Sequence, residues 1–229
     1  MQVDQLGEGL WRWTAPHPAG DANPANPHGV WDQDAASLYH EAVDGIVLID
    51  PLVPESDDGE RFWLHLDRDV TRVGRPPTTV VTTRWHARSA DAVRARYAGT
   101  RTLAIADDLT CHVDEVLSDG STVPGGLAVI IPDAPGAARM AFVHCPCHQL
   151  LWTSDLLIGT AQGGLTPPLA AWFDDPAAQA WLTTGLPQLW PRLHALNSSL
   201  IVPAHGAVVA NHAQAALERA LRADGEPTG

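Results

Sequence analysis

Hydrophobic and polar positions follow a strand-like pattern near the start of the chain and a helical period soon afterwards. Two apolar runs, residues 37–42 and 46–50, flank the dipeptide Asp44-Gly45, which favours a β-hairpin. Apolar side chains then recur at every third or fourth position between residues 58 and 73, which predicts an amphipathic helix. Residues 16–29, rich in Pro, Asn and Gly, predict a loop between the first strands.

Strands and helices alternate along the rest of the sequence. A buried strand is predicted at residues 78–83, followed by a helix over 89–97 with Ser89 at its N-cap. Further predicted elements are strands at 101–106, 127–132, 139–144, 149–154 and 199–203, a broken helical region at 177–196 and a closing helix at 213–222. This alternation is typical of an α/β layer fold.

Composition limits the classes of partner and of chemistry. The 229 residues, 45% of them hydrophobic, fit one domain over residues 1–229 better than two. A formal charge of −13 repels phosphate groups, so we expect no nucleic-acid or membrane partner and instead a small molecule. All 14 basic residues are arginine, which excludes a Schiff base on lysine.

Nothing in the sequence predicts export or membrane insertion. The first residues lack the basic and apolar regions of a signal peptide, and no run approaches the roughly 18 apolar residues of a membrane span. The three cysteines, Cys111, Cys145 and Cys147, are too few for a disulfide framework. We therefore expect a cytoplasmic protein, and the sequence leaves open whether it forms a homodimer.

Three predicted strands end in polar residues, and these ends are the most informative feature of the sequence. The strand 78–83 runs into the segment RWHARS, residues 84–89, and two later strands run into Asp155 and into His205. In open α/β architectures, ligands gather where strands end and loops begin. We therefore expect these residues to converge on one site.

Five segments, in this order along the chain, resemble the metallo-β-lactamase superfamily: GIVLIDP (45–51), TTRWHARS (82–89), DAPGAARMAFVH (133–144), WTSDLLIG (152–159) and IVPAHG (201–206). The resemblance extends over nearly the whole chain. It implies the four-layer αββα sandwich of that superfamily, in which two mixed β-sheets are flanked by helices. It also implies a metal site, because TTRWHARS stands where the family has T-H-x-H-x-D-H.

Carried over residue by residue, the resemblance implies that most of the family's metal ligands are missing. Arg84 stands in place of the first histidine of the motif, Arg88 in place of its aspartate and Ser89 in place of its last histidine. Ala137 stands where a further histidine follows Pro-Gly. Only the second histidine of the motif is kept, as His86.

Three other positions of the family site are kept. The resemblance makes Asp155 the bridging aspartate, His205 the last histidine ligand and Asp50 a supporting carboxylate. A guanidinium has no lone pair to give a metal, so Arg84 and Arg88 cannot be ligands. We hypothesise that Arg84 forms a salt bridge with Asp155 where the family holds a metal.

Two functions from different classes follow from these residues. In the first, the protein is a metal-free member of the fold, a small-anion-binding protein or pseudoenzyme that needs no cofactor. The residues expected to contact its anionic ligand are Arg84, Trp85, Arg88, Ser89 and Asp50.

In the second, the protein is a hydrolase of a small ester, thioester or lactone. Either one zinc or iron ion activates water, or a histidine acts as general base. The residues expected to carry this chemistry are His86, Asp155 and His205.

Two histidines of the loop 16–29, His17 and His28, are further candidates near such a site. They could reach over its mouth, but histidines on a proline-rich loop are more often solvated. We interpret both as solvated loop residues.

The run His144-Cys145-Pro146-Cys147-His148 also carries metal-binding residue types. Its C-x-C spacing differs from the C-x₂₋₄-C of structural zinc sites, and the chain has no second such pair. We interpret it as a tight turn at the end of the strands far from the site, with metal or redox chemistry as the alternative.

Overall fold

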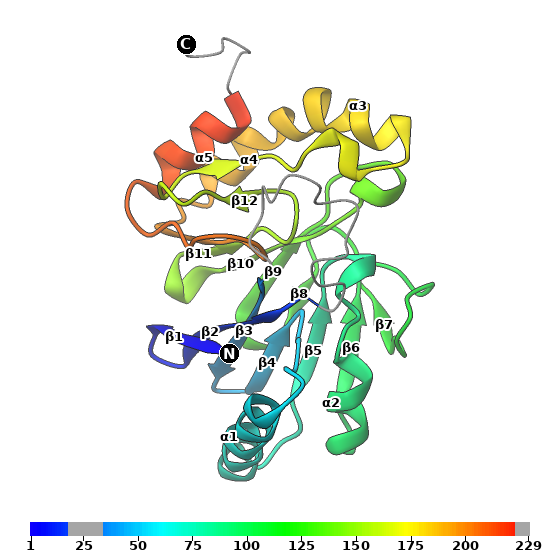
Figure 1. The fold of residues 1–229 in the computed structure, drawn as a ribbon, viewed down its shortest axis with the longest axis vertical. Coiled ribbons are helices and arrows are strands. Elements are labelled where there is room, and N and C mark those ends of the chain that lie inside the picture. Colours follow the sequence, from blue (N-terminus) through cyan, green and yellow to red (C-terminus); the bar gives the residue numbers. More distant parts are fainter. Residues whose placement is uncertain (18–33, 223–229) are drawn as a thin grey trace.

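The computed structural model describes residues 1–17 and 34–222, which form two facing β-sheets with helices on both outer sides (Figure 1). The helices are α1 (Asp57–Val73), α2 (Ala90–Arg96), α3 (Pro176–Thr184), α4 (Trp190–Ala195) and α5 (Ala213–Arg222). The first two cover one sheet and the last three cover the other (Figure 1). The layers are those of the predicted αββα sandwich.

The first sheet contains seven strands in chain order. They are β1 (Gln2–Gly7), β2 (Leu10–Pro16), β3 (Asp34–Ala42), β4 (Gly45–Ile49), β5 (Thr78–Val81), β6 (Arg101–Ala104) and β7 (Glu115–Val116). Pairing is antiparallel from β1 to β4 and parallel from β4 to β7. Parallel strands need a crossover, which α1 and α2 provide, and the ends of β4 and β5 therefore meet at one edge of the sheet.

The second sheet contains five strands in the order β14-β11-β10-β9-β8. They are β8 (Thr122–Val123), β9 (Leu127–Ile130), β10 (Phe142–Cys145), β11 (Leu150–Trp152) and β14 (Leu200–Val202). Only β11 and β14 pair in parallel, so their two ends also lie at one edge. A separate ribbon of β12 (Ile158–Gly159) and β13 (Leu165–Thr166) follows β11 in the chain.

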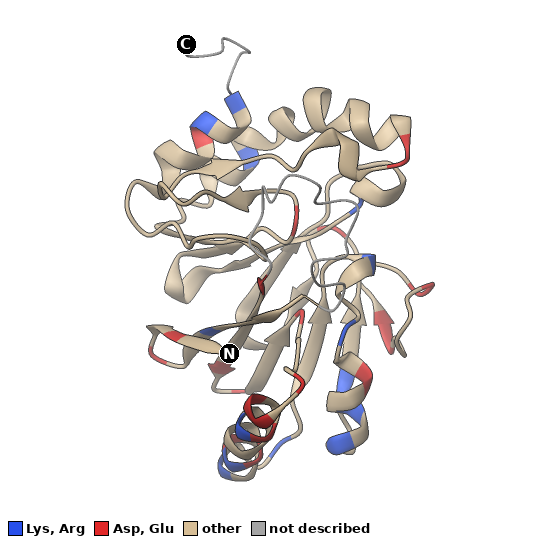
Figure 2. Cartoon of the chain, in the orientation of Figure 1, with Lys and Arg blue, Asp and Glu red and all other residues tan. Residues whose placement is uncertain are grey.

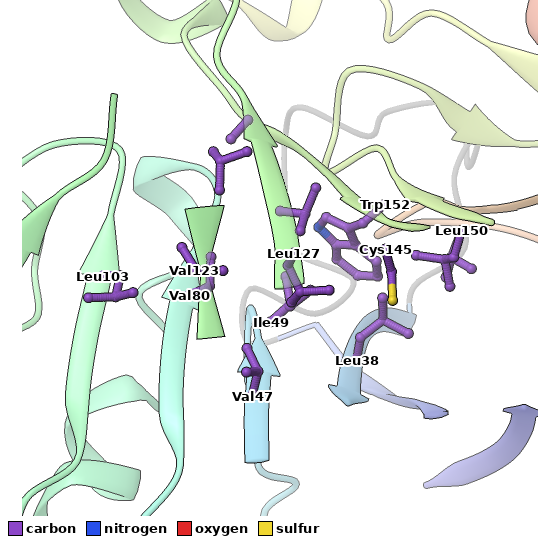
Figure 3. Close-up of a cluster of buried hydrophobic side chains, with 14 of the residues drawn as sticks. Leu38, Val47, Ile49, Val80, Leu103, Val123, Leu127, Cys145, Leu150 and Trp152 are labelled. Atoms are coloured by element: carbon purple, nitrogen blue, oxygen red, sulfur yellow. The ribbon is translucent and has the colours of Figure 1, made fainter. Parts of the chain in front are cut away.

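Three apolar layers hold the sandwich together. Between the sheets, Leu38 and Val80 of the first sheet share a buried cluster with Trp152 of the second (Figure 3). Leu66 of α1 belongs to the layer outside the first sheet, and Leu217 of α5 belongs to the layer outside the second. Each sheet is therefore buried on both faces, which explains why its strands read as continuous apolar runs.

The two sheets also exchange backbone hydrogen bonds at one end of the sandwich. The backbone N–H of Ala36 on β3 donates to the carbonyl of Ala204 at 2.7 Å, and Ala35 forms a β-bridge with His205. The backbone N–H of Ala141 donates to the carbonyl of Thr82 at 2.8 Å. We call this end, where β4, β5, β11 and β14 finish, the seam.

Several predicted elements are confirmed. The hairpin at Asp44-Gly45 joins β3 and β4, and the helix predicted at 213–222 is α5. The strand predicted at 139–144 begins only at Phe142. The strands β7, β8, β12 and β13, which no pattern predicted, are two residues long, too short to show a period; the six-residue β1 was also not predicted.

Charged residues lie mainly on the helices and loops outside the sheets. Figure 2 shows acidic and basic residues side by side on α1, where Arg61 and Asp58 form an ion pair of 3.0 Å. Among the described residues, no helix is long and apolar enough to cross a membrane.

Candidate metal centre at the seam

Asp50, at the end of β4, is the buried centre of the site. Its side chain is fully buried, and one oxygen accepts the backbone N–H of Thr82 at 2.7 Å. The other oxygen accepts the Thr82 hydroxyl and, at 3.1 Å, the indole N–H of Trp152. Trp152 belongs to the second sheet, so this carboxylate joins the two sheets.

His86 lies between two carboxylates. It ends the 3₁₀ helix η2 (Arg84–His86), which follows β5, and its ring is 1% exposed. Its Nδ1 lies 2.8 Å from Asp50, and its Nε2 lies 3.2 Å from Asp155. Asp50 therefore fixes the ring so that Nε2 faces Asp155.

Asp155 and His205 complete the cluster from the second sheet. The Nε2 of His205 lies 3.6 Å from Oδ1 of Asp155, and one ligand atom each from His86, Asp155 and His205 all lie within 4.8 Å of one another. Oδ1 of Asp155 has no hydrogen-bond partner within residues 1–17 and 34–222. The predicted convergence of these three residues is present, whereas their chemical roles stay predictions.

The loop after His205 depends on Gly206. Its φ is 83°, and a Cβ there would lie 2.0 Å from the carbonyl oxygen of Gly159, so only glycine fits. The guanidinium of Arg12 on β2 donates to the Gly206 carbonyl at 3.0 Å. The position of His205 therefore depends on contacts from both sheets.

Protonation at the site follows from burial and neighbouring charge. Burial lowers the pKa of His205 to about 3 against the opposing effect of Asp155, so its ring is neutral at neutral pH. Burial acts to raise the pKa of Asp155, but His86, His205 and Arg88 hold it well below its usual range. Burial and Arg88 act to lower the pKa of His86, yet Asp155 and Asp50 outweigh them and raise it.

The salt bridge hypothesised between Arg84 and Asp155 is wrong. The side chain of Arg84 is 50% exposed, and its guanidinium lies 3.5 Å from Asp108 instead. The 3₁₀ turn after β5 points Arg84 outward and His86 inward, which the sequence alone does not reveal.

Arg88 lies beside the site. Its Nη1 donates to the carbonyls of Ala36 at 3.1 Å and Asp50 at 3.4 Å. Its Nε and Nη2 are buried and have no hydrogen-bond partner in the described part of the chain. The guanidinium thus brings a positive charge to the site. We expected Arg84 to balance the negative charge of Asp155, and Arg88 does so instead.

Strained backbone gathers around the same residues. Asp50, Arg88 and Ser154 adopt left-handed φ values of 51°, 33° and 50°. Such conformations cost about 1–3 kcal/mol each for residues other than glycine and cluster at functional sites.

Ser89 and Trp85 lie at the edge of this cluster. Ser89 is the N-cap residue of α2, but its hydroxyl accepts the backbone N–H of Val53 at 2.9 Å and makes no capping hydrogen bond. Trp85 is 47% exposed, with its ring centroid 6.1 Å from that of Phe173. The contact of Trp85 with a ligand stays a prediction, whereas Ser89 holds the loop after β4.

His17 lies against the site, and interpreting it as a solvated residue was wrong. Its ring centroid is 5.9 Å from that of His205. Burial lowers its pKa, and the nearby charges of Arg88 and His86 lower it further. His28 falls outside the described residues.

Three residues of the site were not predicted from the sequence: Arg12, Thr82 and Trp152. The only signal for Arg12 is an arginine between two tryptophans on an apolar strand. Thr82 and Trp152 look like ordinary strand residues, and only the packing of the sheets reveals their hydrogen bonds to Asp50.

A four-layer αββα sandwich with histidines and carboxylates at the shared ends of its strands defines the metallo-β-lactamase fold. Solved structures of that fold match nearly the whole chain. A metallo-β-lactamase from Pontibacter korlensis has a TM-score of 0.68 and 18% identity, covering 96% of this chain and 97% of that one. One from Hirschia baltica has a TM-score of 0.66 and 16% identity, covering 96% of each chain.

The mono-zinc form of the metallo-β-lactamase FIM-1 from Pseudomonas aeruginosa is similar at a TM-score of 0.65 and 18% identity, covering 96% of this chain and 93% of that one. No protein-family model matches the sequence, and no curated protein is significantly similar to it. The chain therefore has the metallo-β-lactamase fold at a large distance in sequence.

Proposed function

We propose that the protein is a hydrolase that uses a single divalent metal ion held by His86, Asp155 and His205. The observation that carries this proposal is the convergence of three ligand atoms within 4.8 Å of one another, two of them on almost fully buried histidines. Three protein ligands with an open fourth position are typical of catalytic zinc, and two histidines with one carboxylate also suit iron.

The spacing of the donor atoms fits such an ion. Donors about 2.0–2.1 Å from a tetrahedral zinc lie about 3.3–3.4 Å from each other. The Nε2 of His86 lies 3.2 Å from Oδ2 of Asp155 and the Nε2 of His205 lies 3.6 Å from Oδ1, so the two imidazoles face different oxygens of one carboxylate, at distances close to this spacing. Asp155 Oδ1, which lacks a hydrogen-bond partner among the described residues, is one of these donor atoms.

The residues around the three ligands support the same role. A carboxylate on the remote nitrogen of a histidine ligand fixes its tautomer and orientation, and Asp50 has this position behind His86. Burial lowers the pKa of His205, which leaves its ring neutral as a ligand must be, whereas His86, whose pKa Asp155 and Asp50 raise, would have to release its proton to the ion. Arg88 stands where a second ion would need a carboxylate, which favours one ion rather than two.

A bound ion would supply Lewis acidity toward a carbonyl oxygen and a water molecule. The protein's own residues would orient the substrate. Arg88 supplies positive charge for an anionic group, and the exposed face of Trp85 supplies an apolar wall. We therefore expect a small anionic ester, thioester or lactone as substrate.

A metal-free, anion-binding function is the second candidate, and the charges at the site favour it. Asp50 and Asp155 lie against His86, whose pKa they raise, and beside the guanidinium of Arg88, so positive groups face these carboxylates without any metal. Nε and Nη2 of Arg88, which lack partners in the described part of the chain, would then donate their N–H groups to the anion.

Elemental analysis of protein purified without an affinity tag separates the two functions. The wild type should contain about one equivalent of zinc or iron more than Asp155→Ala. Asp108→Ala, which removes the exposed carboxylate beside Arg84, is the control and should keep the wild-type content.

Hydrolysis of simple anionic esters, thioesters and lactones should be lost in Asp155→Ala and on treatment with a chelator. Equal metal content in wild type and Asp155→Ala would overturn the hydrolase proposal and leave the metal-free function.

A further inference from the structure

A second cluster of metal-binding side chains lies at the opposite end of the sandwich. Cys145 ends β10, Cys147 lies in the 3₁₀ turn η5 (Pro146–His148), and His40 lies near the end of β3 in the other sheet. One ligand atom from each of the three lies within 4.8 Å of the others. The start of β3 pairs with His205, so the length of that strand separates this cluster from the seam.

The distances in the cluster are within a few tenths of an ångström to half an ångström of those around a bound ion, and the two thiols do not form a disulfide. The two sulfur atoms are 3.4 Å apart, whereas a disulfide bond is about 2.05 Å long. The sulfur of Cys145 lies 4.0 Å from Nε2 of His40, a nitrogen that donates to the carbonyl of Gly125 at 3.3 Å and would exchange that hydrogen bond for the ion. A tetrahedral zinc with bonds of about 2.3 Å to sulfur and 2.0–2.1 Å to nitrogen separates its donors by about 3.5–3.8 Å.

His148 is the nearest further donor. Its ring stands edge-on to that of His40, with the centroids 5.5 Å apart. Two glycines make room for these rings. A Cβ at Gly7 would lie 2.9 Å from Nδ1 of His148, and a Cβ at Gly125 would lie 2.8 Å from the ring of His40.

His144, although adjacent to Cys145, does not belong to the cluster. Successive side chains of a strand point to opposite faces. Cys145 packs in the apolar layer between the sheets, so His144 faces the other side of β10.

The surroundings suit a cation that enters from solvent. Cys147 is exposed, and it lines an open groove together with His40, His148, Glu8, Glu41 and Arg72, whose guanidinium is ion-paired with Glu41.

We propose that His40, Cys145 and Cys147 bind one Zn²⁺ ion, with His148, which lies outside this group of three and must turn toward the ion, as the fourth ligand. Two thiolates and two imidazoles form the donor set that tetrahedral zinc prefers. The ion links β3 of the first sheet to the turn after β10 of the second, at the end of the sandwich where the seam does not hold the sheets together. Its role is structural and independent of the centre at His86.

Cobalt substitution tests the site, because Co²⁺ replaces zinc and reports a thiolate ligand by a charge-transfer band in the near ultraviolet. The centre of His86, Asp155 and His205 contains no sulfur, so the band reports only the proposed site. Reduced wild-type protein should bind Co²⁺ with this band, and added zinc should remove it.

Three variants assign the band to its residues. Cys147→Ser, which changes an exposed side chain outside the core, should abolish it. Cys111→Ser, the matched change at the third cysteine, and Asp155→Ala, at the seam, should both keep it. Absence of the band in the wild type, or its survival in Cys147→Ser, would overturn the proposal.

A measurement on the wild type alone avoids dependence on variants. Zinc should slow the alkylation of Cys147 by iodoacetamide at least about tenfold, because a coordinated thiolate is shielded. An alkylation rate unchanged by zinc would overturn the proposal. So would a Cys145–Cys147 disulfide in protein isolated without air.

Discussion

Replacing Asp50 by asparagine tests the junction between the sheets most directly. The substitution keeps the shape of the side chain but leaves one oxygen where two now accept hydrogen bonds. If the remaining oxygen faces His86, the Thr82 hydroxyl and Trp152, the new amide group points at the backbone N–H of Thr82. Two donors then face each other in a fully buried place.

The expected cost follows from these contacts. A buried donor left without an acceptor costs about 1–3 kcal/mol. Removing one partner of a buried hydrogen-bonded pair costs up to about 3–5 kcal/mol, and here the partner is His86. These effects overlap, so we expect Asp50→Asn to lose about 3–5 kcal/mol of unfolding free energy. For a chain of this size that corresponds to a melting temperature about 6–20 °C lower.

Thermal unfolding followed by circular dichroism measures this loss. Asp133→Asn is the matched control, because Asp133 is exposed and makes no hydrogen bond or ion pair with any described residue. If Asp50→Asn melted within about 2 °C of that control, a shift worth only about 1 kcal/mol, the carboxylate would not stabilise the junction and the reasoning would fail.

Three further outcomes are expected. Gly206→Ala should lower the unfolding free energy by more than about 2 kcal/mol, because its Cβ would lie 2.0 Å from the Gly159 carbonyl; a urea midpoint equal to that of the wild type would contradict this. Arg12→Met should lower the unfolding free energy by about 1.5–3 kcal/mol, because it removes a charged donor to the Gly206 carbonyl. Its control, Arg222→Met at an exposed ion pair, should lower it by less than about 1 kcal/mol in the same urea titration. Hydrogen bonds from Arg94 and the backbone of Thr102 lower the pKa of Asp114 to about 2. Its stabilising effect should therefore be complete above about pH 4 and lost as the pH falls toward 2, so the stabilities of wild type and Asp114→Asn should converge in acid; a constant difference would refute the assignment.

Much of the fold could be predicted from the sequence because its long elements carry clear periods. The helix α1 and the hairpin of β3 and β4 follow from local patterns alone. The short strands could not be predicted in this way, since two residues carry no period and pair only because neighbouring strands are already in place.

The sequence predicted which residues of the candidate site converge, because convergence depends on where the strands end. It did not predict which way the side chains point. His86, Asp155 and His205 converge because the strands before them finish at one edge. The outward direction of Arg84 depends on a 3₁₀ turn, and the contact of His17 with His205 depends on where its loop begins. Local sequence does not encode either feature.

The position of the site on the seam also has a practical consequence. Any molecule bound between His86 and His205 touches residues from both sheets. Its binding free energy therefore increases the unfolding free energy of the protein. A ligand at a hundred times its dissociation constant would raise the unfolding free energy by about 2.7 kcal/mol. A rise in the melting temperature therefore reports the binding of a ligand at this site. A library of small anions can be screened in this way without knowing the reaction.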